Sequence, residues 1–235
     1  MTQMEPASPV GEPTKSAGLS FKGLIEVFSK PTEFYGKLKN EPKILVPYIV
    51  LALTTAVFFH FAVDYLAQLQ YEATIESGRP VPPGFTADSL KPFMYIGAVF
   101  FLIAPLIYAA VAMFIGNFVL GGETRYKKLL SVMLYGEILF SVGMLLHLPL
   151  ILAKDSIMVS YSLAAILQNP EPQSLAWVGL SKISVFHIWE IIVTGIGFSA
   201  VYDFTRNKGY VLSVITIGGL AAVHVALTAV QAAFN

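Results

Sequence analysis

Five long apolar segments alternate with short polar ones along most of the chain. They lie near residues 44–66, 93–120, 129–153, 185–204 and 210–233. A helix needs about 20 residues to cross a hydrocarbon core about 30 Å thick, so each segment can span a bilayer. The pattern predicts an all-α membrane protein in which residues 42–235 form a bundle of five transmembrane helices.

The region before the first apolar segment is polar and contains a shorter repeat. Phe21, Leu24, Ile25 and Phe28 have the spacing of an amphipathic helix, which Lys30-Pro31 ends. Residues 1–18 lack this spacing and are expected to form a disordered cytoplasmic tail.

Residues 19–41 are therefore expected to form amphipathic helices next to the bundle. These helices either lie on the cytoplasmic membrane surface with their lysines near anionic headgroups or pack beneath the bundle, and the two arrangements are compatible. The lysines expected at the membrane surface are Lys22, Lys30, Lys37, Lys39 and Lys43.

Basic residues are unevenly distributed between the two sides of a five-span bundle. The N-terminal region and the turns at 121–128 and 204–209 carry 11 Lys and Arg residues, whereas the opposite connections carry four. Since cytoplasmic loops of membrane proteins are rich in Lys and Arg, the N-terminus is predicted to be cytoplasmic and the C-terminus outside.

Two features of the spans themselves affect how the helices pack. Pro105 lies near the middle of the second span and predicts a kink. Gly195 and Ser199, and likewise Gly218 and Ala222, have the spacing of small residues that lets helix backbones approach each other. We expect helix contacts at both pairs.

Composition agrees with a membrane protein. The chain is 55% hydrophobic and 13% charged, whereas soluble domains carry roughly 25% charged residues. Its formal net charge is zero, which gives no indication of a nucleic-acid partner and leaves the lipid bilayer as the expected partner. It contains no cysteine, which excludes disulfides, thiolate metal sites and cysteine nucleophiles.

The sequence contains none of the common catalytic motifs. It has no H-E-x-x-H, no G-x-S-x-G, no Walker A sequence and no G-x-G-x-x-G. We therefore expect a protein that is not an enzyme and that needs no cofactor.

All four histidines and two acidic residues are predicted to lie in the outer half of the bilayer. Imidazole and carboxylate groups can bind a divalent metal or relay protons, so these residues are a possible metal or proton site. Alternatively, they are interfacial residues that do not face one another. The set is His60, Asp64, His147, His187, Glu190 and His224.

Glu137 lies about two turns inside the cytoplasmic end of the third span. An acidic residue at the centre of a transmembrane helix costs about 2.5–3.5 kcal/mol, so a partner is expected. One interpretation is a proton- or cation-coupled site or a lipid-headgroup contact; the other is a structural hydrogen bond between helices. Possible partners at similar depth are Asn117, Tyr135, Tyr202 and Asp203.

Several motifs in order resemble the Yip1 domain family of five-span membrane proteins. They are Phe28-Ser29-Lys30-Pro31 with Phe34, the Pro42–Pro47 entry to span one, the turn from Gly121 to Tyr126, and the run from Trp189 to Asn207. The resemblance covers about residues 20–233.

In that family, eukaryotic members act in vesicle trafficking and bind small Rab-type GTPases through a cytosolic N-terminal region. The tail here is much shorter and lacks their acidic-Leu-x-Gly-Pro element, so GTPase binding is not carried over. The chain is more similar to the bacterial branch, which implies the bacterial cytoplasmic (inner) membrane.

Three functional hypotheses follow. The first is a non-enzymatic organiser or adaptor that binds a membrane-protein partner or a second copy of itself. The second is a small transporter or an ion- or lipid-handling protein that uses Glu137 and the outer-half His, Asp and Glu residues. The third is an intramembrane metalloenzyme that uses those outer-half residues.

Overall fold

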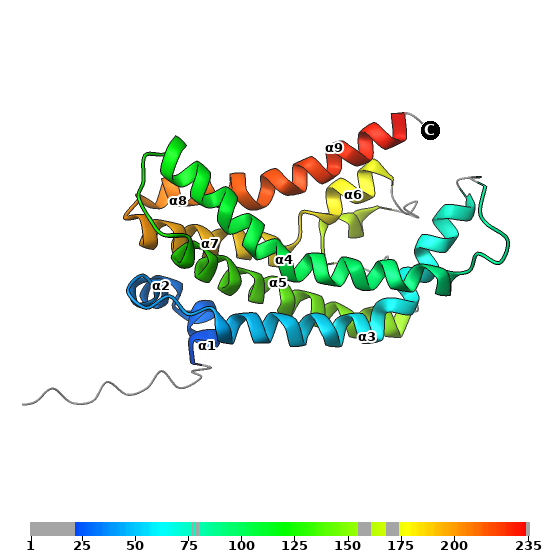
Figure 1. Ribbon diagram of the computed structural model, residues 1–235, viewed down its shortest axis with the longest axis horizontal. Helices are drawn as coiled ribbons and strands as arrows, with labels where there is room; N and C mark the ends of the chain where they lie inside the picture. The colour runs from blue at the N-terminus through cyan, green and yellow to red at the C-terminus, as the bar shows by residue number, and fades with distance from the viewer. Residues whose placement is uncertain (1–21, 77, 79, 155–160, 168–173, 234–235) are drawn as a thin grey trace, which may run out of the picture.

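A computed structural model describes residues 22–76, 78, 80–154, 161–167 and 174–233 (Figure 1). The predicted tail, residues 1–18, lies outside these ranges. Among the described residues, five helices are long and apolar enough to cross a membrane, which confirms the predicted all-α, five-span fold. They are Leu45–Glu76, Ala87–Val119, Tyr126–Lys154, Val185–Tyr202 and Arg206–Val230.

Shorter elements connect these spans or interrupt them. The element bounds are α1 Lys22–Ser29, α2 Pro31–Leu38, α3 Leu45–Glu76, η1 Ala87–Leu90, α4 Lys91–Phe114, η2 Ile115–Val119, α5 Tyr126–Lys154, η3 Leu163–Ile166, α6 Leu175–Ser181, α7 Val185–Tyr202, α8 Arg206–Ser213, η4 Val214–Gly218 and α9 Gly219–Ala233. The segments η2 and η4 are single π-helical turns. Helix α4 contains Pro105 and is bent (Figure 1).

Helices α1 and α2 pack against one end of the bundle, where they contact α5 and α7 (Figure 1). Pro31 has no N–H and a fixed φ, which suits the first position of a helix. It therefore begins α2, and α1 does not continue through it. The two helices bury Val27, Phe34 and Tyr35 against α5 and α7. Packing beneath the bundle is therefore the arrangement in this structure.

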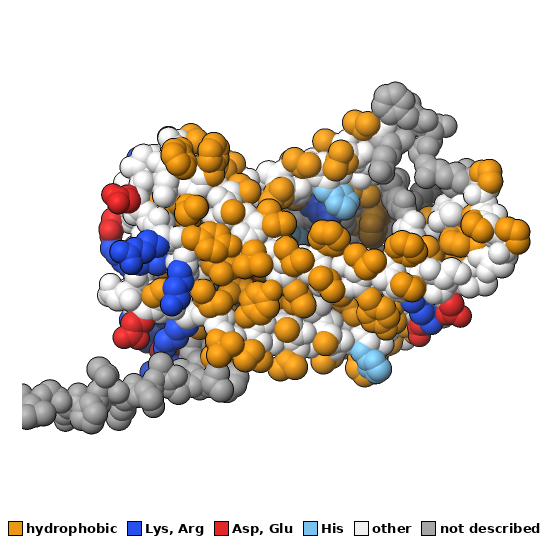
Figure 2. All heavy atoms as spheres, in the orientation of Figure 1, with side chains coloured by type: hydrophobic (Ala, Val, Ile, Leu, Met, Phe, Trp, Pro, Cys, Tyr) orange, Lys and Arg blue, Asp and Glu red, His pale blue; other side chains and the backbone are white. Residues whose placement is uncertain are grey.

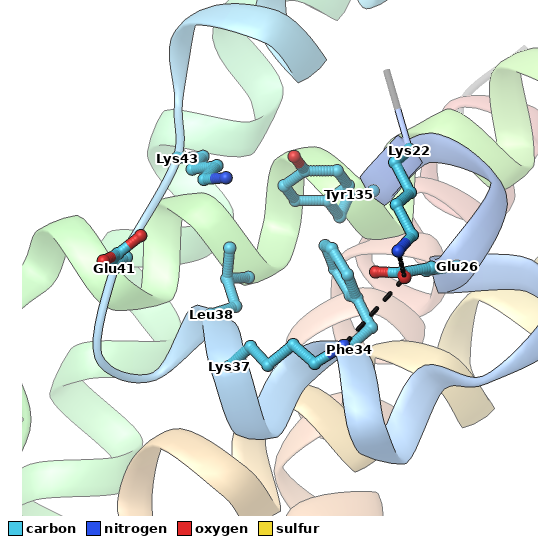
Figure 3. A pocket seen from close by; sticks show the side chains of 9 residues that line it. Lys22, Glu26, Phe34, Lys37, Leu38, Glu41, Lys43 and Tyr135 are labelled. Carbon is cyan, nitrogen blue, oxygen red and sulfur yellow. Dashed lines mark ion pairs between the residues drawn. The ribbon is translucent and has the colours of Figure 1, made fainter. Parts of the chain in front are cut away.

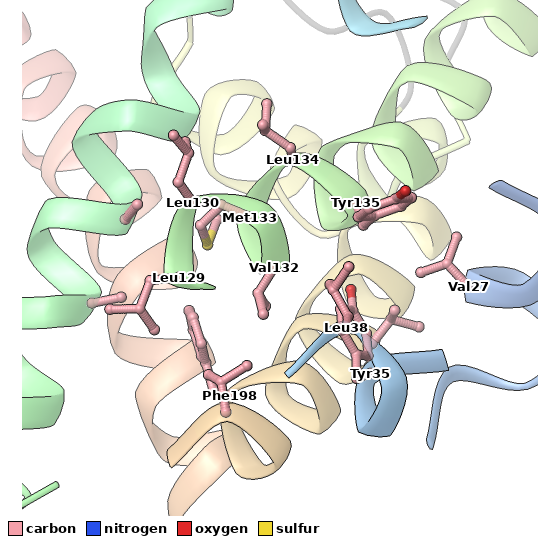
Figure 4. Packing of buried hydrophobic residues seen from close by; sticks show 14 of the residues in the cluster. Val27, Tyr35, Leu38, Leu129, Leu130, Val132, Met133, Leu134, Tyr135 and Phe198 are labelled. Carbon is pink, nitrogen blue, oxygen red and sulfur yellow. The ribbon is translucent and has the colours of Figure 1, made fainter. Parts of the chain in front are cut away.

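Helix α5 is the centre of the bundle. It packs against α3, α4 and α7, and side chains on all its faces are buried, which explains why it is apolar all round. Leu129, Val132, Met133 and Leu134 are fully buried, and Figure 4 shows Phe198 of α7 beside them. Charged side chains gather instead near the ends of the molecule (Figure 2).

Helix α7 is shorter than α5 and begins partway along it. A Cβ on Gly143, which lies within α5, would overlap the Phe186 ring at the start of α7. Beyond this point the segment before α7 lies beside α5, because Tyr161 donates a hydrogen bond to the Leu146 carbonyl at 3.2 Å. One face of the first turns of α7 therefore packs on α5, while Val185, Ile188 and Trp189 on the other face are exposed.

Helix α8 packs closely on α7, whereas α9 stands away from it. A Cβ on Gly209 would overlap Ser199 and the Gly195 carbonyl, so the small residues allow the α7–α8 approach. After the π-turn η4, α9 packs against α6 (Figure 1). This divergence opens a groove toward the lipid.

Candidate functional site

Two acidic side chains meet in the interior of the bundle. Glu137 on α5 and Glu190 on α7 are 3% and 2% exposed, and both line a cavity of about 210 Å³, the central cavity. Its other lining residues are Phe101, Ala104, Tyr108, Phe140, Lys182, His187 and Ile217.

A glycine explains how the two carboxyl groups come together. A Cβ on Gly136 would overlap Thr194 Oγ1 and lie 3.8 Å from Glu190 Cγ, so only glycine lets α7 approach α5 here. Counting from the expected start of the fourth span predicts Glu190 in the outer half of the bilayer. In the structure Glu190 lies beside Gly136, the residue before Glu137, so the two acidic residues lie at the same level of the bundle.

Neither carboxyl group forms an ion pair within the described ranges. Two hydroxyl groups nearby also lack a hydrogen-bond partner among the described residues, those of Thr194 and Tyr35. Burial, with smaller contributions from Tyr135 and Glu190, raises the pKa of the Tyr35 phenol. Buried polar groups without partners are uncommon in proteins and are often found at functional sites.

Lys182 and His187 line the central cavity and two further cavities. Ser184 caps α7: its Oγ accepts a hydrogen bond from the His187 N–H at 3.1 Å and lies 3.3 Å from Nδ1 of the ring. The His187 ring lies against Phe140, 4.6 Å between centroids. Lys182 follows α6, and burial lowers the pKa of its ammonium group.

The second cavity, the α6 pocket, has a volume of about 220 Å³. His147, Tyr161 and Trp177 line it together with Lys182 and His187. The Trp177 indole N–H is buried and has no partner among the described residues. The α6 pocket therefore presents hydrogen-bond donors to its interior.

The third cavity, the lateral groove, has a volume of about 600 Å³ and is larger than the central cavity and the α6 pocket. It lies between α7 and α9, and its walls are almost entirely apolar apart from Lys182 and His187. The remaining lining residues are Leu175, Ile183, Ile188, Ile191, Gly218, Ala221, Ala222, Val225, Ala226 and Ala229.

None of the other residues of the predicted outer-half set lines the central cavity, although His147 lines the neighbouring α6 pocket. His60 is exposed beside Phe61, and Asp64 forms an ion pair with Lys91. His147 packs on Tyr161, and His224 is exposed on α9. In the described part of the chain, no three His, Asp or Glu residues are close enough to hold a metal ion.

The partners expected for Glu137 also lie elsewhere. Asn117 donates a hydrogen bond to the Thr124 carbonyl at 3.4 Å, and Tyr202 donates one to the Ala112 carbonyl at 3.2 Å. Asp203 pairs with Lys39, with 2.6 Å between Nζ and Oδ2. Tyr108 and Lys182 line the central cavity although neither is among the site residues predicted from the sequence, in which Lys182 is one of the loop charges.

The lysines expected at the membrane surface separate into two groups. Lys30 pairs with Glu33, and Lys39 pairs with Asp203. The other three, Lys22, Lys37 and Lys43, line a cavity at the N-terminal end of the bundle.

Comparison with known proteins agrees with this architecture. The Yip1 domain model matches residues 25–229. The chain is 25% identical over 207 residues to "Membrane protein YknW" of Bacillus subtilis (strain 168), which covers 83% of this chain and 85% of the relative. No solved structure matches the chain. With its five apolar helices and a family match over most of its length, this multi-pass integral membrane protein belongs to the Yip1 domain family.

Proposed function

We propose that this protein is a non-enzymatic organiser or adaptor that binds a transmembrane helix of a partner protein in the lateral groove. The observation that carries the proposal is the groove itself, about 600 Å³ of space between α7 and α9 with apolar walls. A bilayer supplies two occupants for such a space, lipid chains and helices.

The α9 wall of the groove favours a helix. Gly218, Ala222 and Ala226 recur every fourth residue and line the groove. Small residues at this spacing let two helix backbones approach closely, and such close packing is a main source of helix association in membranes. A flexible acyl chain gains little packing energy against a flat wall of small residues.

The floor of the groove favours a specific helix. Lys182 and His187 are polar groups at the base of an otherwise apolar surface. A polar side chain on the partner helix can form hydrogen bonds to them, and such bonds between transmembrane helices contribute about 0.6–2 kcal/mol each. The groove can therefore distinguish a partner with a polar residue at this depth from a purely apolar helix.

Site-specific photocrosslinking tests the proposal. A photoreactive residue at Ala222 faces the groove, whereas the same residue at the adjacent, exposed Val223 does not line it. In native membranes we expect a discrete protein adduct from position 222 and only lipid adducts from position 223. Ala226→Phe, which narrows the groove, should abolish the protein adduct. Lipid adducts alone at 222, or equal protein adducts at both positions, would contradict the proposal.

A second function, ion or lipid handling, is favoured by the central cavity. Glu137 and Glu190 share this cavity, and Lys182 and His187 connect it to both the α6 pocket and the lateral groove. Intramembrane acidic residues often mark ion or proton pathways. In proteoliposomes, proton flux or lipid exchange that is lost in Glu137→Gln and Glu190→Gln would support this function; no flux above empty liposomes would contradict it.

We also propose a location and an orientation. The Bacillus subtilis relative supports a bacterial cytoplasmic membrane. The excess of Lys and Arg at the end with α1 and α2 supports a cytoplasmic N-terminus. Labelling of single cysteines at Lys30 and Asp88 with an impermeant reagent tests this, because the chain contains no other cysteine. In intact cells, only position 88 should react.

A further inference from the structure

A cavity of about 230 Å³ lies between α1, α2 and α5 at the N-terminal end of the bundle, and we call it the lysine pocket. Lys22, Lys37 and Lys43 are at its rim, and the rings of Phe34 and Tyr135 form its floor (Figure 3). Glu26 and Glu41 also line it, so lysines outnumber carboxylates three to two.

The floor carries a hydrogen-bonding group without a partner. Tyr135 is fully buried, and its hydroxyl has no partner in the described part of the chain. A Cβ on Gly23 would lie 3.2 Å from this hydroxyl and 2.9 Å from the Phe34 ring, so glycine keeps the space above the hydroxyl open. A buried hydroxyl without a partner beside a pocket is a group for which a ligand can supply the missing hydrogen bond.

Two of the three rim lysines form ion pairs, and the third is fixed through its backbone. Lys22 and Lys37 both pair with Glu26 Oε1, at 3.4 and 4.0 Å. The backbone of Lys43 is fixed to α5, because its N–H donates to Ser131 Oγ at 3.0 Å and its carbonyl accepts from the same oxygen at 2.6 Å.

The Lys43 ammonium has no ion pair with any described residue and points toward Tyr135 (Figure 3). It is the cation of the rim that remains available to a ligand. An ammonium group and a phenol on one side of a cavity together suit an anion.

We propose that the lysine pocket binds a phosphate group, carried either by a lipid headgroup or by free inorganic phosphate. Ammonium groups donate hydrogen bonds, and the Tyr135 phenol can donate one, so the ligand must accept several bonds at once. Phosphate oxygens do so, and lysine is a common phosphate ligand. Lys43 lies two residues before α3, so a headgroup at the bilayer boundary can reach it.

Binding to the detergent-purified full chain tests this proposal. Three probes separate the sources of phosphate: dihexanoyl phosphatidic acid, dihexanoylglycerol, which lacks the phosphate, and inorganic phosphate. We expect saturable binding of the phosphatidic acid, measured by titration calorimetry, and none of dihexanoylglycerol. Comparable binding of inorganic phosphate would identify free phosphate as a ligand; binding of the lipid alone would identify the headgroup.

Variants decide whether the pocket is the site. Lys43→Gln should weaken binding about tenfold and Tyr135→Phe by a few-fold, since each removes one donor to a charged acceptor. Lys30→Gln, which removes an exposed charge outside the pocket, should have no effect. Equal losses in Lys43→Gln and Lys30→Gln, unchanged binding in Lys43→Gln, or equal binding of dihexanoylglycerol would overturn the proposal. If Tyr135→Phe does not fold, the comparison of the two lysine variants still decides.

Discussion

Glu137 on α5 and Glu190 on α7 line the same buried cavity and carry like charge in their ionised forms. Two carboxylates side by side in a medium of low dielectric constant repel each other much more strongly than in water. Ionisation of both groups at once is therefore unfavourable, and the pair shares its cavity with Lys182 and His187.

The first prediction concerns this pair. Glu137→Gln keeps the shape of the side chain, removes one charge and adds an amide donor that can bond to Glu190. We expect the free energy of unfolding in detergent to be unchanged or higher by about 1 kcal/mol, and the same for Glu190→Gln. The increase in the free energy of unfolding of the double variant should be about 1 kcal/mol smaller than the sum of the two single increases. The effects of substitutions at interacting residues are not additive.

The control for this cycle is Glu33→Gln, which changes an exposed carboxylate on α2. Combined with Glu137→Gln, it should be additive within about 0.5 kcal/mol, since the two residues share no partner. Strict additivity of Glu137→Gln with Glu190→Gln would show that the two carboxyl groups do not interact.

The five spans could be predicted from the sequence because hydropathy over about 20 residues reports directly on the hydrocarbon environment. The pairing of Glu137 with Glu190 could not. Depth estimated from the expected ends of each span places the two residues apart, and no sequence pattern shows that Tyr161 and Phe186 lie beside α5. The contact depends on Gly136 and Gly143, whose role is visible only when α7 is in place.

The lateral groove was only partly predictable. The small residues Gly218 and Ala222 indicate a helix contact, but the spacing cannot say whether that contact is made within the chain. For Gly195 the contact is internal, against Tyr210 of α8. For Gly218 and Ala222 the facing surface is the groove.

The second prediction concerns the close approach of α7 to the π-turn η2. A Cβ on Gly116 would overlap the ring and hydroxyl of Tyr202, which also donates a hydrogen bond to the Ala112 carbonyl. Gly116→Ala should lower the free energy of unfolding by about 1–3 kcal/mol, because overpacking forces the ring to move.

The matched control is Gly97→Ala in α4, where a Cβ meets no atom within 4 Å. In a helix interior, alanine is more favourable than glycine by about 0.8–1 kcal/mol, so this variant should be neutral or stabilising. Both are measured by thermal unfolding in the same detergent. Equal destabilisation by the two substitutions would mean that Tyr202 does not restrict position 116.

The third prediction separates packing from lipid exposure. Leu139 on α5 is fully buried among helices, whereas Leu53 on α3 is 61% exposed and faces the surrounding lipid. Leu139→Ala removes packing contacts and leaves a cavity, so it should lower the free energy of unfolding by about 1–3 kcal/mol. This cost is at the low end of the values for Leu→Ala in soluble proteins. The hydrophobic contribution is absent, because a leucine that leaves the core in a membrane is solvated by lipid and not by water.

Leu53→Ala should change the free energy of unfolding by less than about 0.5 kcal/mol, since lipid chains can occupy the space that the side chain leaves. Unfolding by a denaturing detergent in mixed micelles compares the two. A cost at Leu53 as large as that at Leu139 would indicate that α3 packs against another protein surface at this position, not against lipid.

The fourth prediction concerns Asp203, which ends α7 with φ of 57° and pairs with Lys39 at the end of α2. Asparagine tolerates the left-handed conformation but lacks the charge, so Asp203→Asn reports on the ion pair. Because Asp203 is 77% exposed, the loss should be below about 1 kcal/mol and should shrink as salt is added. Asp203→Ala additionally meets the left-handed penalty and should cost about 1–2 kcal/mol more. If Asp203→Ala and Asp203→Asn are equally stable in thermal unfolding, backbone conformation does not determine the residue at this helix end.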